Sequence, residues 1–300
     1  MFLAAASGAQ PSGPFKAEYV YSLSTSFGVI PFNDVSLSWD PVHKELFAIG
    51  EGLVRVFNES GMEIFSFGDD PEVGPISAVA PLEGGDLIVI AYRNGDRALV
   101  RCTFRGEFIE QLTIRDVPPE FEGAARGGAM RYRDGRIYLA DLGAMRIVVL
   151  DVTGRFITGF DVAEKLEVGS KRETLGLRGF NVDKAGNMLF TIQPMFQAYV
   201  MGLDGGITPF GIKGSAPGKF NVVAGIARDD DGLIYVSDIL KSAVIVFDQN
   251  FIFLREFGYR TRAASGLSAP DEVAAGDGKL FVVNHARRGV SVFKVGIPKE

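Results

Sequence analysis

Cysteine and histidine are scarce in this sequence. Its 300 residues include one cysteine, Cys102, and two histidines, His43 and His285. A single cysteine excludes an internal disulfide, and the absence of a C-x-x-C-H segment excludes covalent haem attachment. Two histidines are too few for a multi-histidine zinc site. Cys102 lies in the alternating run ALVRCTF, which favours a half-buried strand thiol over a nucleophile, because no base partner is visible beside it.

Long apolar runs and an excess of positive charge are also missing. No run beyond the N-terminal leader approaches the roughly 18–20 uncharged apolar residues that a membrane-spanning helix requires. The formal net charge of −6 leaves no excess of cations to displace the counterions of a nucleic acid. We therefore expect neither a membrane span nor a nucleic-acid partner.

The first residues, MFLAAASGAQ, have the pattern of the end of a secretory signal. A short apolar segment precedes a small-x-small pattern at Ser7 and Ala9, although the usual positively charged start is missing. We predict that residues 1–14 are a signal-peptide remnant and that the protein is exported to the periplasm or secreted. The alternative is a flexible leader on a cytoplasmic protein.

The sequence contains a degenerate repeat and 37 glycines. Residues 225–258 read GIARDDDGLIYVSDILKSAVIVFDQNFIFLREFG, which is four short apolar runs separated by turn residues. The second run, LIYVSD, has five counterparts at successive spacings of 41, 50, 51, 46 and 46 residues: ELFAIG, DLIVIA, RIYLAD, NMLFTI and KLFVVN. A period of about 40–50 residues with four strands in each unit is typical of a β-propeller.

The last unit of the repeat is incomplete. It stops after its third strand, GVSVFKV (289–295), whereas the N-terminal segment AEYVYSLSTSFG (17–28) has the alternation and the final Phe-Gly of a fourth strand. Pairing these two segments would close the ring and remove its exposed sheet edges. We therefore predict an all-β fold over residues 15–300, a six-bladed β-propeller of four-stranded antiparallel blades.

The units resemble NHL repeats, with blades three and five matching best. The match is weaker in blades one, two and four, where Gly50, Ala91 and Ile192 stand in place of the strand-end aspartate. The resemblance implies a six-bladed propeller that serves as a platform for other molecules, and less often as an enzyme. The matching residues of blade five include Gly225, Ile226, Ala227, Asp229, Gly232, Ile234, Tyr235, Asp238, Val246, Phe247, Asp248, Phe257 and Gly258.

Residues 35–50, VSLSWDPVHKELFAIG, are similar to a segment of the lactonase-like propellers. The acidic metal ligand that those families place four residues before the tryptophan falls here on Val35, and Asp34 is one residue out of register. This resemblance implies an alternative function, a divalent-metal-dependent lactonase-like hydrolase or lyase with its site at the channel mouth. The ligands would be Asp34, Asp271, Glu272 and Asn284.

One face of the predicted propeller gathers the loops between strands two and three and the connections between blades. Such a loop-rich face with the channel mouth is the usual binding surface. Cations are dense there, although local acids such as Asp96 provide alternative partners. The residues predicted to contact a partner are Arg93, Arg97, Arg126, Arg178, Met195, Phe196, Lys241, Arg260, Arg262, His285, Arg287 and Arg288.

The leading hypothesis is a non-catalytic scaffold without a cofactor, which binds a protein partner through this face. A small anion or a polysaccharide in the channel is a further possibility. Met195 and Phe196 could equally cap the core of a neighbouring blade. Two local patterns complete the prediction: a short helix within 161–178, and a tight turn, rather than a calcium site, at Asp229–Asp231.

Overall fold

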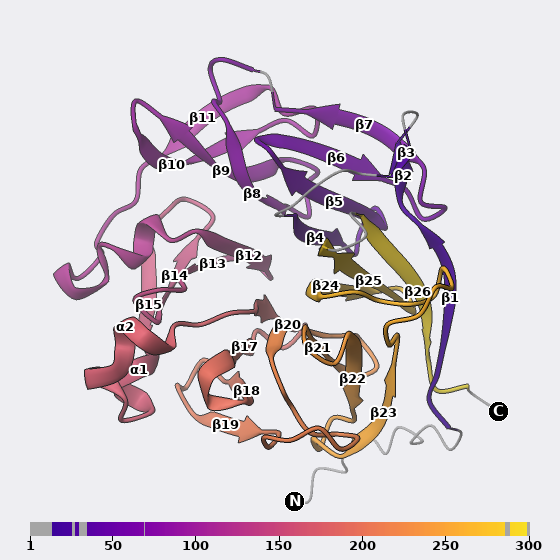
Figure 1. The fold of residues 1–300 in the computed structure, drawn as a ribbon. Coiled ribbons are helices and arrows are strands. Elements are labelled where there is room, and N and C mark those ends of the chain that lie inside the picture. Colours follow the sequence, from indigo (N-terminus) through magenta and orange to yellow (C-terminus); the bar gives the residue numbers. More distant parts are fainter. Residues whose placement is uncertain (1–13, 26–27, 30–34, 69, 286–288, 299–300) are drawn as a thin grey trace, which may run out of the picture.

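Six four-stranded antiparallel sheets form a closed ring around a central channel (Figure 1). The computed structural model describes residues 14–298 except 26–27, 30–34, 69 and 286–288. The predicted six-bladed propeller is thus confirmed. Each blade contributes its first strand to the wall of the channel: β4 (Ser36–Asp40), β8 (Ile76–Pro81), β12 (Ala129–Arg133), β16 (Phe180–Val182), β20 (Val223–Arg228) and β24 (Pro270–Gly276).

The second strand of each blade is the segment that reveals the repeat in the sequence. These strands are almost completely buried, because each sheet is covered on both faces by its neighbours in the ring. Apolar residues therefore occupy successive positions rather than alternating ones. The second strands are β5 (Glu45–Gly50), β9 (Leu87–Arg93), β13 (Arg136–Asp141), β17 (Met188–Ile192), β21 (Ile234–Asp238) and β25 (Lys279–Asn284).

The third strands remain mostly buried, whereas the fourth strands lie at the rim of the ring and are only partly buried. Blades 1 to 6 follow the order of the chain. The third strands are β6 (Leu53–Phe57), β10 (Asp96–Cys102), β14 (Arg146–Asp151), β18 (Gln197–Met201), β22 (Ala243–Phe247) and β26 (Val290–Gly296). The fourth strands of blades 1 to 5 are β7 (Glu63–Phe67), β11 (Phe108–Leu112), β15 (Phe156–Asp161), β19 (Ile207–Phe210) and β23 (Phe253–Phe257).

The N-terminal strand β1 (Lys16–Ser22) closes the ring, as the sequence predicts. It pairs antiparallel with β26 and becomes the outer strand of blade 6, and Figure 1 shows the indigo and yellow ribbons side by side. The strand ends earlier than the predicted segment 17–28. A separate hairpin of β2 (Ser24–Thr25) and β3 (Gly28–Val29) follows it. The predicted leader, residues 1–14, falls outside the described residues except for Pro14.

The tight turns after the first strands have the conformation predicted for their Asp-Gly pairs. In blade 3 both central residues, Asp134 and Gly135, have positive φ angles of 47° and 73°. This geometry belongs to the mirror-image turn that favours Asp-Gly in hairpins. In blade 5 the carboxylate of Asp229 accepts hydrogen bonds from the amide of Leu233 and the hydroxyl of Tyr235, so the acidic run there stabilises a turn, as predicted.

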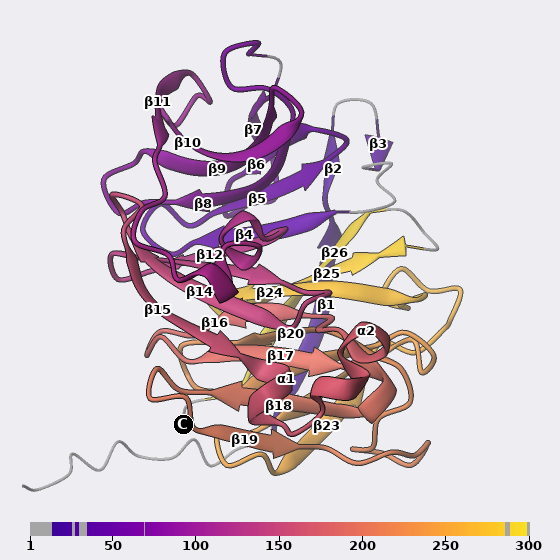
Figure 2. The same cartoon turned by 90° about the vertical axis from the view of Figure 1, so that its left-hand side faces the viewer.

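Short helices lie between blades 2 and 3 and between blades 3 and 4. The predicted helix within 161–178 is present as two single turns, α1 (Val162–Lys165) and α2 (Arg172–Leu175), joined by η3 (Gly169–Lys171). Both views place them beside blade 4 (Figure 1, Figure 2). The remaining turns are η1 (Pro119–Phe121), η2 (Ala124–Arg126) and η4 (Gln193–Met195). None of the helices in the described residues is long and apolar enough to cross a membrane.

Cys102 lies at the end of β10 and is completely buried between blades 1 and 2. Burial raises the pKa of its thiol to about 12, so the thiolate is not populated near neutral pH. A cysteine nucleophile requires the thiolate. The structural role that the sequence predicts for Cys102 is therefore consistent with its position.

Candidate functional site

A cavity of about 490 Å³ opens at the end of the channel where the inner strands begin. We call it the upper chamber. Its walls come from all six inner strands, β4, β8, β12, β16, β20 and β24, and its lining includes Arg131, Arg178, Asp271, Glu272 and His285. Five ionisable side chains from four separate parts of the chain therefore meet in one cavity.

A β-bulge in β24 places two consecutive carboxylates in this chamber. Pro270 pairs with Asn284 and Val273 pairs with Val282, so the register of β24 against β25 shifts by one residue between them. Successive residues of a regular strand point to opposite faces, whereas a bulge redirects a side chain. As a result, Asp271 and Glu272 both line the upper chamber.

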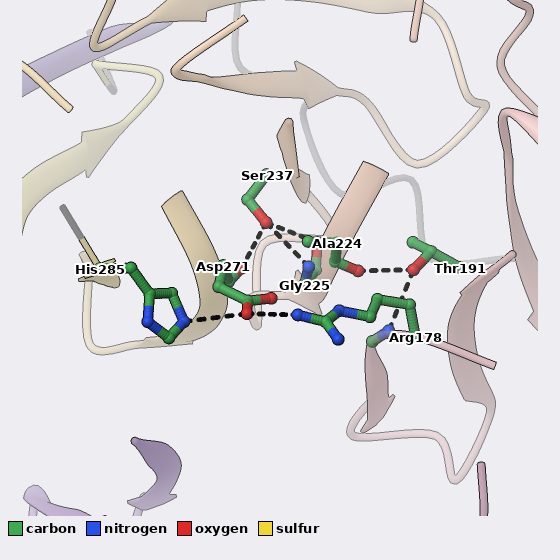
Figure 3. A network of polar contacts seen from close by, with 8 residues as sticks. Arg178, Thr191, Ala224, Gly225, Ser237, Asp271 and His285 are labelled. Carbon is green, nitrogen blue, oxygen red and sulfur yellow. Dashed lines mark hydrogen bonds and ion pairs between the residues drawn. The ribbon is translucent and has the colours of Figure 1, made fainter. Parts of the chain in front are cut away.

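Asp271 accepts hydrogen bonds from two cationic or potentially cationic side chains (Figure 3). One Nη of Arg178, which lies two residues before β16, is 2.6 Å from Oδ2 of Asp271. Nε2 of His285, which follows β25, lies 3.0 Å from the same oxygen. The side chains of Arg178 and His285 are 50% and 29% exposed, so both remain accessible from the channel mouth.

The contact with Asp271 defines the hydrogen-bonding state of His285. A carboxylate can only accept, so Nε2 must carry the hydrogen that lies between the two groups. In the neutral ring, Nδ1 is then the basic nitrogen. It forms no hydrogen bond to any residue that the structure describes. His285 thus has the arrangement of a general base that is oriented by a carboxylate.

Buried hydroxyl groups fix the backbone beneath this cluster (Figure 3). The hydroxyl of Ser237 donates to the carbonyl of Asp271 and accepts from the amide of Gly225, at 2.8 Å in the second contact. The hydroxyl of Thr191 donates to the carbonyl of Ala224 at 2.5 Å. These contacts join blades 4, 5 and 6 at the level of the site and hold the bulge of β24 in place.

Glu272 forms the floor of the upper chamber with Arg131. Its Oε1 accepts hydrogen bonds from an Nη of Arg131 at 2.8 Å and from the amide of Leu37 at 3.1 Å. Arg131 belongs to β12 and Glu272 to β24, which are three blades apart, so this ion pair spans the channel. Burial raises the pKa of Glu272, while Arg131 acts in the opposite direction by stabilising the ionised carboxylate.

The metal ligands predicted from the sequence do not converge in the described residues. Asp34 lies outside them. Asp271 and Glu272 are each paired with an arginine, and Oδ1 of the buried Asn284 accepts the amide of Ser268 at 2.7 Å. Within the described part of the chain, no three His, Cys, Asp or Glu side chains gather where they could hold a metal ion. The described members of this set are thus engaged with other groups of the protein, whereas a divalent cation prefers several unpaired oxygen ligands, and the metal site stays a prediction.

Three of the predicted partner-binding arginines contact nearby side chains of the protein itself. Arg93 donates to the Gln111 side chain at 3.0 Å and covers the ring of Phe108. Arg97 lies over the ring of Tyr92 and donates to its hydroxyl. Arg126 forms a 3.0 Å ion pair with Asp96, and both side chains are more than 60% exposed. Their role in partner binding stays a prediction.

Lys241, Met195 and Phe196 are not free surface side chains. Lys241 is only 6% exposed, and its ammonium pairs with Glu256 inside blade 5. Met195 and Phe196 are half-buried against the cores on the two sides of blade 4. The capping role that the sequence leaves open for this pair therefore describes their position.

Arg260 and Arg262 differ from the other predicted contact residues. Both lie in the exposed segment 259–265 between blades 5 and 6. Within the described residues, neither arginine forms an ion pair. Arg287 and Arg288 fall outside the described residues.

The sequence predicted Asp271 and Glu272 as metal ligands and Arg178 and His285 as partner contacts. It did not predict that the two pairs share one cavity, and it missed Arg131. The missing signal is a charged residue in the middle of an inner strand, where most blades place small or apolar residues. The hydroxyl groups of Thr191 and Ser237 carried no signal, because a single hydroxyl in a buried strand is compatible with many environments.

Comparison with known proteins supports the fold and leaves the family open. No family model and no curated protein sequence matches the chain. Among solved structures, virginiamycin B lyase from Staphylococcus aureus has a TM-score of 0.57 at 15% identity, over 95% of this chain and 89% of that one. The PQQ-bound aldose sugar dehydrogenase from Streptomyces coelicolor has a TM-score of 0.58 at 12% identity, over 95% and 100%.

A third similar structure is a protein proposed to be a gluconolactonase. Its TM-score is 0.59 at 14% identity, and the alignment covers 96% of this chain and 94% of that one. At sequence identities this low, the structural similarity is evidence of a common fold but not of a common activity. The comparisons therefore agree with the six-bladed propeller, while membership in the NHL-repeat family stays a prediction.

Proposed function

We propose that the upper chamber is a catalytic site for acid–base cleavage of a carbon–oxygen bond in a small lactone or ester. The observation that carries the proposal is the Asp271–His285 contact, which orients the imidazole and leaves Nδ1 without a hydrogen-bond partner among the described residues. A general base at this position could take a proton from water in hydrolysis, or from a carbon next to a carbonyl in elimination.

Arg178 completes the arrangement that such a reaction requires. Attack on a carbonyl, or removal of a proton beside it, places negative charge on the carbonyl oxygen, and a fixed cation or hydrogen-bond donor stabilises that charge. Arg178 is half exposed and is held beside His285 by their shared partner Asp271. The fold neighbours include a lyase and a protein proposed to be a lactonase, which supports this choice of substrates.

Replacing His285 with alanine is expected to lower kcat at least ~100-fold on a substrate of this class, the usual loss for a general base. The measurement is cleavage of five- and six-membered lactones and aryl esters by the purified full-length chain. Added imidazole is expected to restore part of the rate, because it can enter the space that the side chain leaves.

His43→Ala provides a matched control for this experiment. His43 is the second histidine of the chain, lies in the turn after β4 and pairs with Asp40 at 2.7 Å, away from the upper chamber. Its replacement is expected to leave the rate unchanged. The proposal is wrong if the wild-type protein cleaves none of these substrates, or if His285→Ala retains the wild-type rate.

The exposed segment 259–265 supports a second candidate function, the partner-binding platform that the NHL-like repeats imply. Arg260 and Arg262 project from it without an ion pair to any described residue, and Tyr259 is 48% exposed beside them. Aromatic and arginine side chains are the types that most often anchor a protein contact. The corresponding partner would present an acidic surface to this segment.

Reversing the charge of both residues, in Arg260→Glu/Arg262→Glu, is expected to abolish retention of such a partner. The wild-type complex should also weaken with rising salt, because exposed charges are screened. The measurement is quantitative affinity purification from the native source at a series of salt concentrations. Arg105→Glu, which reverses an exposed arginine in the turn between β10 and β11, is the control. Equal retention by the double variant would contradict this function.

A further inference from the structure

A second cavity, of about 600 Å³, lies between blades 1 and 2, near the end of β4 and away from the upper chamber. We call it the side pocket. Phe47 and Val56 of blade 1 and Leu87 of blade 2 line it and are buried. Phe65 and Phe104 also line it, but they remain 38% and 61% exposed. The side pocket is therefore an opening in the apolar packing between two blades.

The same space is filled between blades 5 and 6. Phe47 pairs with Val56 of β6, and Tyr235 pairs with Val246 of β22, so Phe47 and Tyr235 hold the same position in blades 1 and 5. The ring of Phe15 lies beside Tyr235, with their centroids 6.3 Å apart. The chain itself thus places an aromatic ring in the space that stays open between blades 1 and 2.

Blade 1 also has a carboxylate where blade 5 has an apolar side chain. Glu45 faces Asp40 across the turn after β4. Leu233 faces Asp229 in the same way in blade 5, and it belongs to the same buried cluster as Phe15. Glu45 instead lines the side pocket, where its carboxylate accepts no hydrogen bond and forms no ion pair with any described residue. Burial raises the pKa of this carboxyl group.

The other charged groups of the side pocket are not in contact with Glu45. Asp40 and His43 pair with each other, with Oδ2 and Nδ1 2.7 Å apart. Arg105 is exposed and lies over the ring of Phe104, 5.4 Å from its centroid, and it makes no ion pair with Glu45. The pocket therefore combines aromatic walls with one partly buried carboxylate that has no cationic partner among the described residues.

We propose that the side pocket binds a small aromatic amine, with its ring against Phe47 and Phe65 and its ammonium group at Glu45. Aromatic faces and a carboxylate both stabilise a cation, the latter through a charge-assisted hydrogen bond. The volume lies within the range of roughly 300–1,000 Å³ that is usual for small-molecule sites. This binding site is independent of the reaction proposed for the upper chamber.

Binding can be measured by fluorine NMR with para-fluorophenethylamine, whose resonance broadens when the amine is bound to a large protein. The purified full-length chain is titrated at neutral pH and constant ionic strength. Two analogues with the same ring serve as comparisons, the neutral para-fluorophenethyl alcohol and the anionic para-fluorophenylpropionate. The amine is expected to bind saturably and about tenfold more tightly than the alcohol, because only the amine forms a charge-assisted hydrogen bond with a carboxylate. The propionate should bind more weakly still.

Glu45→Gln is expected to weaken the affinity for the amine about tenfold and to leave that for the alcohol nearly unchanged. Glu45→Leu, which introduces the residue type that blade 5 has at this position, should reduce amine binding further. Phe104→Ala should weaken it about threefold, the usual contribution of an exposed cation–π contact. Glu83→Gln is the matched control, because Glu83 is exposed in the turn between β8 and β9 and does not line the side pocket.

Three results would overturn the proposal. The first is the absence of saturable binding of the amine to the wild type. The second is equal affinity in the wild type and Glu45→Gln, with both proteins folded by circular dichroism. The third is loss of amine binding in His285→Ala, which would place the amine in the upper chamber. Unchanged amine binding in His285→Ala, together with loss of lactone cleavage, would show that the two sites are separate.

Discussion

Replacing Gly225 with alanine is expected to lower the free energy of unfolding by about 3 kcal/mol, the upper end of the usual range for overpacking a buried site. A Cβ atom at Gly225 would lie 2.4 Å from the carbonyl oxygen of Asp271 and 2.8 Å from the amide nitrogen of Val273. Both are backbone atoms of the neighbouring blade. A change of rotamer therefore cannot relieve the contact, and the two strands must move apart.

The same substitution should also affect the upper chamber. The carbonyl that would be displaced is the acceptor of the Ser237 hydroxyl, which holds the bulge carrying Asp271 and Glu272. Gly84→Ala is the matched control, because a Cβ there meets no atom within 4 Å. Urea unfolding of the three proteins measures the effect. A loss of stability in Gly225→Ala no larger than in Gly84→Ala would show that β20 and β24 do not approach as closely as described.

Replacing Arg131 with methionine is expected to destabilise the fold by about 2–3 kcal/mol at pH 7, because it leaves the carboxylate of Glu272 in the channel without its cation. The expected destabilisation is smaller than that for breaking a fully buried ion pair, because the Glu272 side chain remains 27% exposed. Glu272→Gln in the same background should recover most of the stability. An exposed pair provides the comparison: Arg155→Met, which removes the partner of Asp116, should cost less than about 1 kcal/mol.

The effect of Arg131→Met should depend on pH. Burial already raises the pKa of Glu272, and Arg131 opposes that increase, so removal of the arginine raises the pKa of the folded state further. A group whose pKa is raised by folding loses stabilisation as the pH rises through that pKa. The variant should therefore be closest to the wild type at acidic pH, and the gap should widen towards pH 7. A gap that is constant between acidic and neutral pH would contradict an ionised Glu272 as the cause.

The architecture could be predicted almost completely from the sequence, because each blade repeats similar strand and turn patterns. Segments such as LIYVSD are long enough to form a buried strand, and Asp-Gly pairs mark the tight turns. The spacing of these signals then gives the number of blades. The closing role of β1 also follows, since the last unit lacks one strand. The hairpin β2–β3 was not predicted, because two-residue strands carry no periodic pattern.

The candidate site could be predicted only in part, because its contacts join distant blades. Glu272 was recognised as a channel residue, but its partner Arg131 lies 141 positions away on the opposite wall. Lys241 shows the converse limit. Its place in a predicted loop suggested exposure, yet the neighbouring strand brings Glu256 beneath it and buries both charges. Pairings of this kind depend on how blades pack, which no local pattern encodes.

The closure of the ring by β1 and β26 also has a consequence for how the protein folds during its synthesis. Translation produces β1 before the other described strands and its sheet partner β26 after all of them, so the two can pair only after the strands between them have been made. Until then β1 has no sheet to join, and β25 lacks its outer neighbour. Unpaired strand edges on a growing chain are prone to wrong association. Synthesis of β26 therefore determines when the exposed edges of blade 6 are paired and protected from association with other chains.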